Sequence, residues 1–163
     1  MVEENKELQC FKINNVHWMA NLAEPIIKLA QIIDHPSITS QSLHMHLANI
    51  AAVAKQTDAV ELWGVFTEDG QCIAFADWCV KSLPYNGTVY MEFIYSWNRK
   101  REPVMMLLDE WRKYGERKFA KPYFMADLIN ESVMKVFDKI VTDLGYEYKR
   151  TGIINTIGWK KNG

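Results

Sequence analysis

The fold of this chain is decided by residues 60–97, whose sequence is VELWGVFTEDGQCIAFADWCVKSLPYNGTVYMEFIYSW. The stretch contains three runs rich in β-branched and aromatic residues, at 60–66, 72–80 and 88–97. Asp69-Gly70 and Asn86-Gly87 lie between these runs, and both dipeptides favour tight turns. Because consecutive strands joined by tight turns pair antiparallel, the stretch predicts a three-stranded antiparallel meander.

The residues before the meander predict one strand and two helices. Residues 8–18 (LQCFKINNVHW) form the strand. Asn21 and Glu24 have the spacing of a capping box, and the helix that they open is ended by His35-Pro36. A second helix is predicted from about Ser40. The apolar faces of the two helices are Ile26, Ile27, Leu29, Ala30 and Ile33, and Leu43, Leu47, Ile50, Ala51 and Ala54.

The residues after the meander predict a helix, a strand, a second helix and a final strand. Pro103 suits the first turn of a helix whose apolar stripe is Val104, Leu107, Leu108, Trp111 and Tyr114. Residues 121–129 (KPYFMADLI) form a strand that runs parallel to the one at 88–97. Asn130 is placed to cap the next helix, Gly145 to end it, and the last strand or hairpin covers 146–159. The complete order, β-α-α-β-β-β-α-β-α-β, predicts one α/β (α+β) domain with a mixed sheet over residues 1–163.

Composition excludes several classes of function. Lys and Arg number 19 against 20 Asp and Glu, so the overall charge favours neither a nucleic-acid partner nor a membrane surface. The N-terminal residues MVEENKELQC lack the apolar core of a signal peptide, and no apolar run reaches the ~20 residues of a membrane span. Three cysteines without C-x-x-C spacing are typical of buried thiols in a reducing compartment. We therefore expect a cytoplasmic protein.

The predicted order of elements resembles the GNAT (GCN5-related N-acetyltransferase) family over nearly the whole chain. Aligned on Leu107 and Leu108, residues 98–103 (NRKREP) fall on the loop that binds acetyl-CoA in that family. The resemblance implies that backbone N–H groups of this loop and the following helix N-terminus hold the pyrophosphate. Arg101 and Pro103 occupy the family's two glycine positions, and Pro103 has no N–H to donate.

Side-chain charge offers a substitute for the lost backbone contacts. Arg99, Lys100 and Arg101 are three successive basic residues at a predicted helix N-terminus, where charge and dipole both favour an anion. A solvated charged loop is the alternative interpretation. Asn130 falls on the family's Asn after the strand, or serves only as a helix cap. Phe137 falls where the family often has a Tyr that protonates the departing thiolate, and Phe cannot donate a proton.

Glu92 is the candidate general base, because acyl transfer to an amine requires removal of a proton near the end of the strand at 88–97. Strict alternation places Glu92 with Ile94 and Ser96, opposite the face of Met91, Phe93, Tyr95 and Trp97. A solvent-facing or ion-paired carboxylate is the alternative. Asp77 is a weaker candidate base, and Tyr95 or Tyr146 would replace the missing acid. The expected acetyl-CoA contacts are Tyr95, Trp97, Asn98, Arg99, Lys100, Arg101, Val104 and Asn130.

No metal site is predicted, because His44 and His46 project about 200° apart on a helix and no Cys or carboxylate completes a set in the sequence. The leading hypothesis is a GNAT-type acyltransferase that passes an acetyl group from acetyl-CoA to an amine acceptor. The chain, short and with an altered cofactor loop, also resembles the divergent GNAT-like proteins of bacteriophage genomes. The alternative is a catalytically inactive GNAT-like interaction or structural protein. A PAS-type sensor fits only the first half of the chain. Exposed aromatic residues such as Trp97, Trp111 or Trp159 would support a homodimer.

Overall fold

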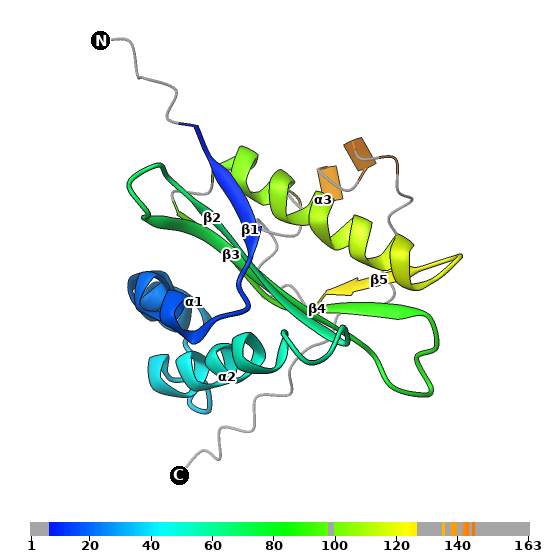
Figure 1. Cartoon of the computed structure of the whole chain (residues 1–163), viewed down its shortest axis with the longest axis horizontal. Helices are drawn as coiled ribbons and strands as arrows, with labels where there is room; N and C mark the ends of the chain where they lie inside the picture. The colour runs from blue at the N-terminus through cyan, green and yellow to red at the C-terminus, as the bar shows by residue number, and fades with distance from the viewer. Residues whose placement is uncertain are drawn as a thin grey trace. The chain divides into compact units, whose positions relative to one another are not determined.

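A five-stranded mixed sheet organises the chain up to residue 126, and its strands lie side by side in their sequence order (Figure 1). The strands are β1 (Gln9–Lys12), β2 (Val60–Phe66), β3 (Cys72–Val80), β4 (Thr88–Ser96) and β5 (Tyr123–Ala126). β1 to β4 pair antiparallel, and β4 pairs parallel with β5. The predicted meander and the predicted parallel pair are both confirmed.

The computed structural model describes residues 7–97 and 100–126, and beyond them residues 135, 138, 139, 142, 143 and 145. Contacts along the chain separate residues 1–126 from residues 127–163 as two units. In the second unit the described residues from 135 to 143 have helical backbone, and Gly145 follows with a φ of 85°, as the predicted helix end requires. The predicted cap Asn130 and the last strand lie outside the described residues. A single domain over 1–163 stays a prediction.

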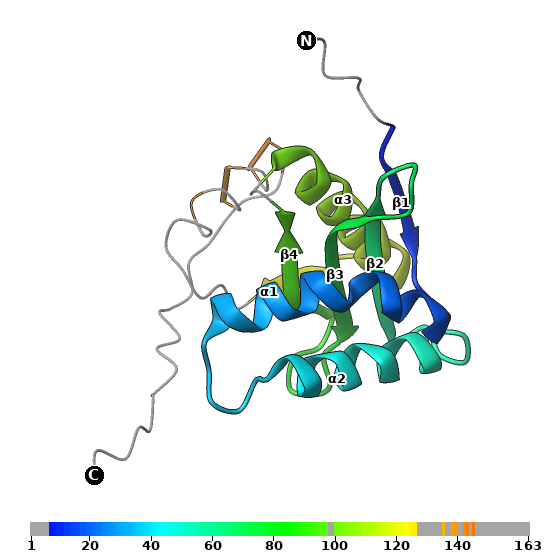
Figure 2. The ribbon, with the colours of Figure 1, turned by 90° about the vertical axis from the view of Figure 1, so that its left-hand side faces the viewer.

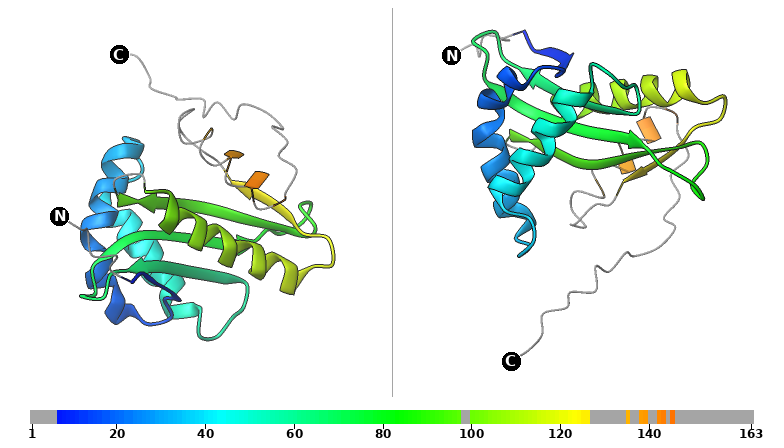
Figure 3. Two further views of the ribbon diagram at one scale, coloured as in Figure 1. Left: turned by 90° about the horizontal axis from the view of Figure 1, so that it is seen from above. Right: turned by 60° about the horizontal axis from the view of Figure 1, so that its bottom comes forward.

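Helices cover the two faces of the sheet unequally (Figures 2 and 3). The helices α1 (Ala23–Ile33) and α2 (Ser40–Val53) pack on one face, where Leu47, Phe75 and Tyr95 belong to one hydrophobic core. The helix α3 (Arg101–Lys118) packs on the other face. There the ring of Tyr114 lies 6.4 Å from the ring of Trp78 on β3. β3 and β4 therefore separate two packed layers, and a side chain's place along either strand decides which helices it meets.

The helix boundaries follow from local signals. Thr39 and Ser42 form a capping box in which the Thr39 side chain accepts from the Ser42 N–H and the Ser42 hydroxyl accepts from the Thr39 N–H. α3 has Pro103 in its first turn, where a missing N–H costs little. The residues buried along α2 and α3 match the predicted stripes: Leu43, Leu47, Ile50 and Ala51, and Leu107, Leu108, Trp111 and Tyr114.

Three details near the N-terminus differ from the sequence prediction. The first strand ends at Lys12, and a 3-10 helix, η1 (Val16–Leu22), follows it, because the Asn15 side chain accepts from the His17 N–H and Met19 and Leu22 turn into the core. Asn21 forms no capping box, since its side chain donates to the Gly70 carbonyl and α1 begins at Ala23 without a side-chain cap.

Ile27 was expected on the buried face of α1 and is 46% exposed, because it lies beyond the edge of the stripe that faces the sheet. Trp111, which would support a homodimer only if exposed, is buried, as its place in the predicted stripe of α3 requires. Its ring packs edge-on against Phe124 of β5, with 5.0 Å between ring centres. The homodimer itself stays a prediction.

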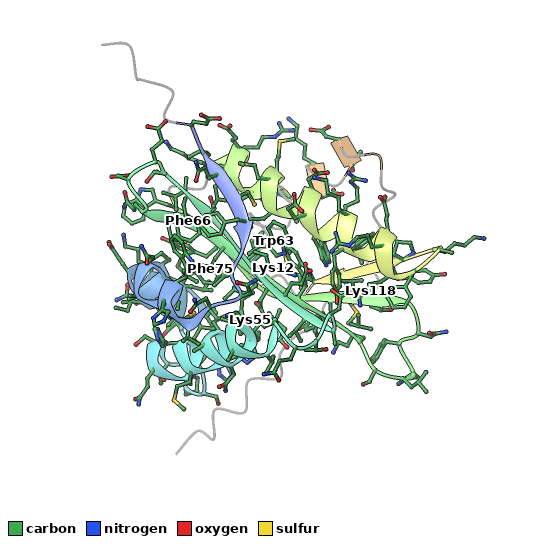
Figure 4. All side chains as sticks on the ribbon, in the orientation of Figure 1. Lys12, Lys55, Trp63, Phe66, Phe75 and Lys118 are labelled. Atoms are coloured by element: carbon green, nitrogen blue, oxygen red, sulfur yellow. The ribbon has the colours of Figure 1, made fainter. Side chains whose placement is uncertain are left out.

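A buried carboxylate, Glu61, joins β1, β2, β3 and α3. It accepts from the indole N–H groups of Trp63 (2.8 Å) and Trp78 (3.2 Å), and it pairs with Lys12 of β1 and Arg117 of α3 at 3.5 and 3.4 Å. Figure 4 labels Lys12 and Trp63, which face each other across the β1–β2 ladder. A buried carboxylate with this many donors is satisfied, and it serves to hold the α3 layer on the sheet.

Cysteine burial agrees in part with the sequence prediction. Cys72 is buried, while Cys10 and Cys79 are half-buried, and burial raises the pKa of the Cys72 thiol to about 12. Among the described residues, no helix has both the length and the apolar character needed to cross a bilayer.

Candidate functional site

A β-bulge in β4 determines where Glu92 points. Phe93 is the partner of Asp77 and Met91 is the partner of Trp78, so Glu92 is an extra residue between two consecutive cross-strand pairs. An extra residue interrupts the alternation of side chains between the two faces of a strand. Side chains before and after the bulge therefore alternate between the two faces of the sheet in opposite phase.

Two consecutive residues of β4 face α1 and α2 as a result. Phe93 packs against the core beneath these helices, and the Glu92 carboxylate contacts His46 of α2. Met91 faces α3, because it lies opposite Trp78 in the ladder. The strict alternation expected from the sequence, which separated Glu92 from Phe93, is therefore wrong at this residue. The bulge places Glu92 on the same face as Tyr95.

Glu92 belongs to a three-residue cluster built from three elements, α2, β3 and β4. His46 Nε2 lies 2.6 Å from Glu92 Oε2 and 3.6 Å from Asp77 Oδ2. The other Asp77 oxygen, Oδ1, accepts a hydrogen bond of 3.0 Å from the Phe93 N–H. The side chain of Asp77 is 1% exposed, whereas those of His46 and Glu92 are 40% and 31% exposed. The cluster therefore has a buried end at Asp77 and an accessible end at Glu92.

The charges of the cluster follow from these contacts. Close contact with the Asp77 and Glu92 carboxylates raises the pKa of His46 to about 10, and contact with His46 holds the pKa of Glu92 below its usual range. Burial raises the pKa of Asp77 to about 6, against the opposing effect of His46. Near neutral pH the cluster therefore contains an imidazolium and two carboxylates, and it has a net charge of about −1.

Within the described part of the chain, the same three groups could together hold a metal ion. His46, Asp77 and Glu92 each offer one ligand atom, and these atoms lie within 4.8 Å of one another. Sequence spacing indicated no such set, because Asp77 and Glu92 are remote from His46 along the chain. Only pairing between β3 and β4, with α2 packed across them, brings the carboxylates to the imidazole.

Tyr95 and Trp97, expected to contact the cofactor, lie on the α1 side of the sheet. Tyr95 is 7% exposed and its ring centre is 5.9 Å from that of Phe75. Burial raises the pKa of its hydroxyl, with Glu24 adding to the effect. Lys28 of α1 places its ammonium 3.0 Å from the ring centre of Trp97, a cation–π contact. The end of β4 is therefore lined by aromatic rings and one lysine.

The loop after β4 is described in part. Asn98 and Arg99 lie outside the described residues, as do Asn130, Phe137 and Tyr146. Lys100 is exposed immediately before α3, and its carbonyl accepts from the Ser96 hydroxyl at 3.2 Å. Arg101 is the first residue of α3 and is exposed, and Val104 is half-buried in its first turn. The basic residues that are described thus lie at a helix N-terminus, as the sequence predicted.

His46 is the residue of the cluster that sequence reasoning did not select. It lies three positions after Leu43 and four before Ile50, both of which are buried. A polar residue at this spacing lies beside the apolar stripe of the helix and near the sheet. That position was the available signal, but it did not indicate which residues of β3 and β4 the imidazole would meet.

No protein-family model and no curated protein matches this sequence. Solved structures with the same fold include aminoglycoside N-acetyltransferase AAC(6')-Iy in complex with CoA, with 19% identity, a TM-score of 0.68 and coverage of 94% of this chain and 96% of that one. Glucosamine-6-phosphate N-acetyltransferase from Arabidopsis thaliana has 11% identity, a TM-score of 0.64 and coverage of 90% and 96%. Ribosomal-protein-alanine N-acetyltransferase from Brucella melitensis biovar Abortus 2308 has 18% identity, a TM-score of 0.63 and coverage of 90% and 96%. The chain therefore has the GNAT fold.

Proposed function

We propose that this protein is a GNAT-type acyltransferase that transfers an acetyl group from acetyl-CoA to an amine. The observation that carries the proposal is the ionised, partly exposed Glu92 carboxylate, which the bulge directs onto the α2-covered face of β4. The fold supports this proposal. Of two structures of AAC(6')-Iy, which has the same fold, one contains CoA and the other a CoA-S-monomethyl-acetylneamine bisubstrate analogue.

The chemistry requires an anionic group near the acceptor. In the reaction the amine nitrogen bonds to the thioester carbonyl carbon, the carbon–sulfur bond breaks, the CoA thiolate leaves, and the nitrogen loses a proton. Because contact with His46 lowers the pKa of Glu92, the carboxylate attracts and orients a protonated amine more strongly than it deprotonates it. We assign Glu92 to binding the acceptor and to receiving the proton that the ammonium nitrogen must lose before its lone pair can attack the thioester. The nitrogen loses its second proton after the new bond has formed. Tyr95 is the candidate donor of a proton to the thiolate.

The cofactor is assigned to the end of β4 and the start of α3. Basic side chains at a helix N-terminus attract phosphates, and Lys100 and Arg101 occupy that position. Pro103 cannot contribute a backbone N–H, so side-chain charge has to supply more of the binding than in a glycine-rich loop. The complete proposed set is Tyr95, Trp97, Asn98, Arg99, Lys100, Arg101, Val104 and Asn130.

Isothermal titration of acetyl-CoA tests the binding half of the proposal. We expect Arg101→Ala to weaken binding about tenfold or more, the loss of roughly one charge-assisted hydrogen bond. Lys113→Ala is the matched control, because it removes a cation from the same helix three turns further along. Equal affinities for the two variants would show that Arg101 does not contact the phosphates. No heat at millimolar acetyl-CoA would overturn the acyltransferase assignment.

Release of free CoA in the presence of a panel of amines tests the chemical half. We expect Glu92→Gln to lower kcat/KM by about 10²–10⁴-fold, the usual contribution of a positioned acid–base group. Glu116→Gln, an exposed substitution on α3, should leave it unchanged. Binding of acetyl-CoA without CoA release from any amine would favour the alternative, a catalytically inactive GNAT-like interaction or structural protein.

A further inference from the structure

We propose that Asp77 and His46 are positioning residues for this reaction, which together direct the Glu92 carboxylate toward the acceptor amine. The inference rests on the proposed acyl transfer and extends it to two residues that need not touch either substrate. It is carried by the geometry of the bulge, by the burial of Asp77, and by the position of His46 between two carboxylates.

Asp77 holds the bulge in place. A bulge leaves one backbone group without its usual partner in the ladder, and here the Phe93 N–H is bound by the Asp77 side chain at 3.0 Å. Asp77 is the cross-strand neighbour of Phe93, so its carboxylate reaches this N–H from directly opposite. The direction of Glu92, the residue immediately before Phe93, therefore depends on the Asp77 side chain.

Asp77 also requires His46. A carboxylate that is 1% exposed is costly unless a cation or several donors compensate it. Among the described residues, the cation within ion-pair distance of Asp77 is the His46 imidazolium, and the same holds for Glu92. Lys81 lies at longer range and acts on Glu92 through space only. His46 thus compensates two carboxylates through a single ring nitrogen.

Contact with the His46 imidazolium also lowers the pKa of Glu92. Without the imidazolium, Asp77 and Glu92 would be two neighbouring carboxylates, and like charges raise each other's pKa. Cys79, the other titratable group close to both carboxylates, carries no positive charge that could replace it. A protonated Glu92 cannot attract an ammonium group. The imidazolium therefore extends the pH range in which Glu92 can bind a cationic acceptor.

The charge of His46 is directly measurable by NMR of the histidine rings in the full-length protein, with EDTA present so that no metal ion replaces the proton. We expect one of the four histidines, assigned through His46→Gln, to remain an imidazolium above pH 8. Asp77→Asn should lower the pKa of that ring by about 1–3 units, the effect of removing one adjacent opposite charge. His44→Gln, two residues away on α2, is the matched control and should leave the signal in place. If His46 of the wild-type protein loses its proton near pH 6.5, its ion pairs with Asp77 and Glu92 do not form as described. That result would overturn the inference, and it requires no variant.

The pH dependence of kcat/KM for CoA release tests the link to Glu92. We expect the acidic limb of the profile to move to higher pH in His46→Gln, where the imidazolium is lost, and to stay in place in His44→Gln. Identical acidic limbs in wild type and His46→Gln would refute a positioning role. If the wild-type protein releases no CoA, the proposed function fails, while the ring titration still decides whether the charged cluster exists.

Discussion

Replacing Glu61 by Ala should destabilise the protein strongly, because this side chain is the common acceptor of the layer between the sheet and α3. Its oxygens receive the indole N–H groups of Trp63 and Trp78 and pair with Lys12 and Arg117. Glu61 is 1% exposed, so water does not replace it in the folded protein without rearrangement. The substitution therefore leaves donors without an acceptor inside a packed layer.

The expected magnitude follows from which donors remain buried. Trp78 is fully buried, so its unpaired indole N–H costs about 1–3 kcal/mol. Trp63 is half-buried and contributes about 1 kcal/mol, and the lost methylene and carboxylate volume about as much again. The side chains of Lys12 and Arg117 are 35% and 55% exposed, so their cations regain water and add little. We expect the free energy of unfolding to fall by about 3–5 kcal/mol.

Urea denaturation followed by circular dichroism at 222 nm measures this difference, with tryptophan fluorescence as a second probe. The dependence of the unfolding free energy on urea should stay the same, so that the midpoints report stability. Glu116→Ala is the matched control, because Glu116 is an exposed α3 residue paired with Arg112, and its loss should cost about 0–0.5 kcal/mol. A loss for Glu61→Ala no larger than that for Glu116→Ala would refute the reasoning that the buried carboxylate holds this layer together.

Two further predictions concern His46 and Gly115. Because the pKa of His46 rises from 6.5 to about 10 on folding, its stabilisation is fully present below pH 6.5 and is lost as the pH rises toward 10. The difference in unfolding free energy between wild type and His46→Gln should therefore shrink over that range in urea titrations, and a constant difference would contradict the assignment. Gly115→Ala would place its Cβ 2.5 Å from two ring atoms of Phe124, so we expect a loss of about 1–3 kcal/mol and a lower Tm than for Lys113→Ala. An unchanged Tm would show that α3 and β5 pack less closely than described.

The sheet was predictable because its signals are local. The turn dipeptides Asp69-Gly70 and Asn86-Gly87 separate β-forming runs, and the observed strands at 60–66 and 72–80 have the predicted bounds. The stripes of α2 and α3 were equally clear, because a period of 3–4 residues persists over several turns. The region before α1 was not predicted correctly, since Asn21 matched a capping box by spacing but bonds to Gly70, 49 residues away.

Glu92 shows which properties of the site follow from the sequence and which follow only from the tertiary structure. The sequence by itself determined that a carboxylate lies on the last strand of a three-stranded antiparallel meander, the strand that also forms a parallel pair, because strand propensity and turn chemistry are properties of neighbouring residues. Only the tertiary structure decided where that carboxylate points and which charge it meets. A bulge depends on the register between β3 and β4, and His46 reaches Glu92 only after α2 packs across both strands. Such contacts between residues remote in the chain leave no periodic pattern in it.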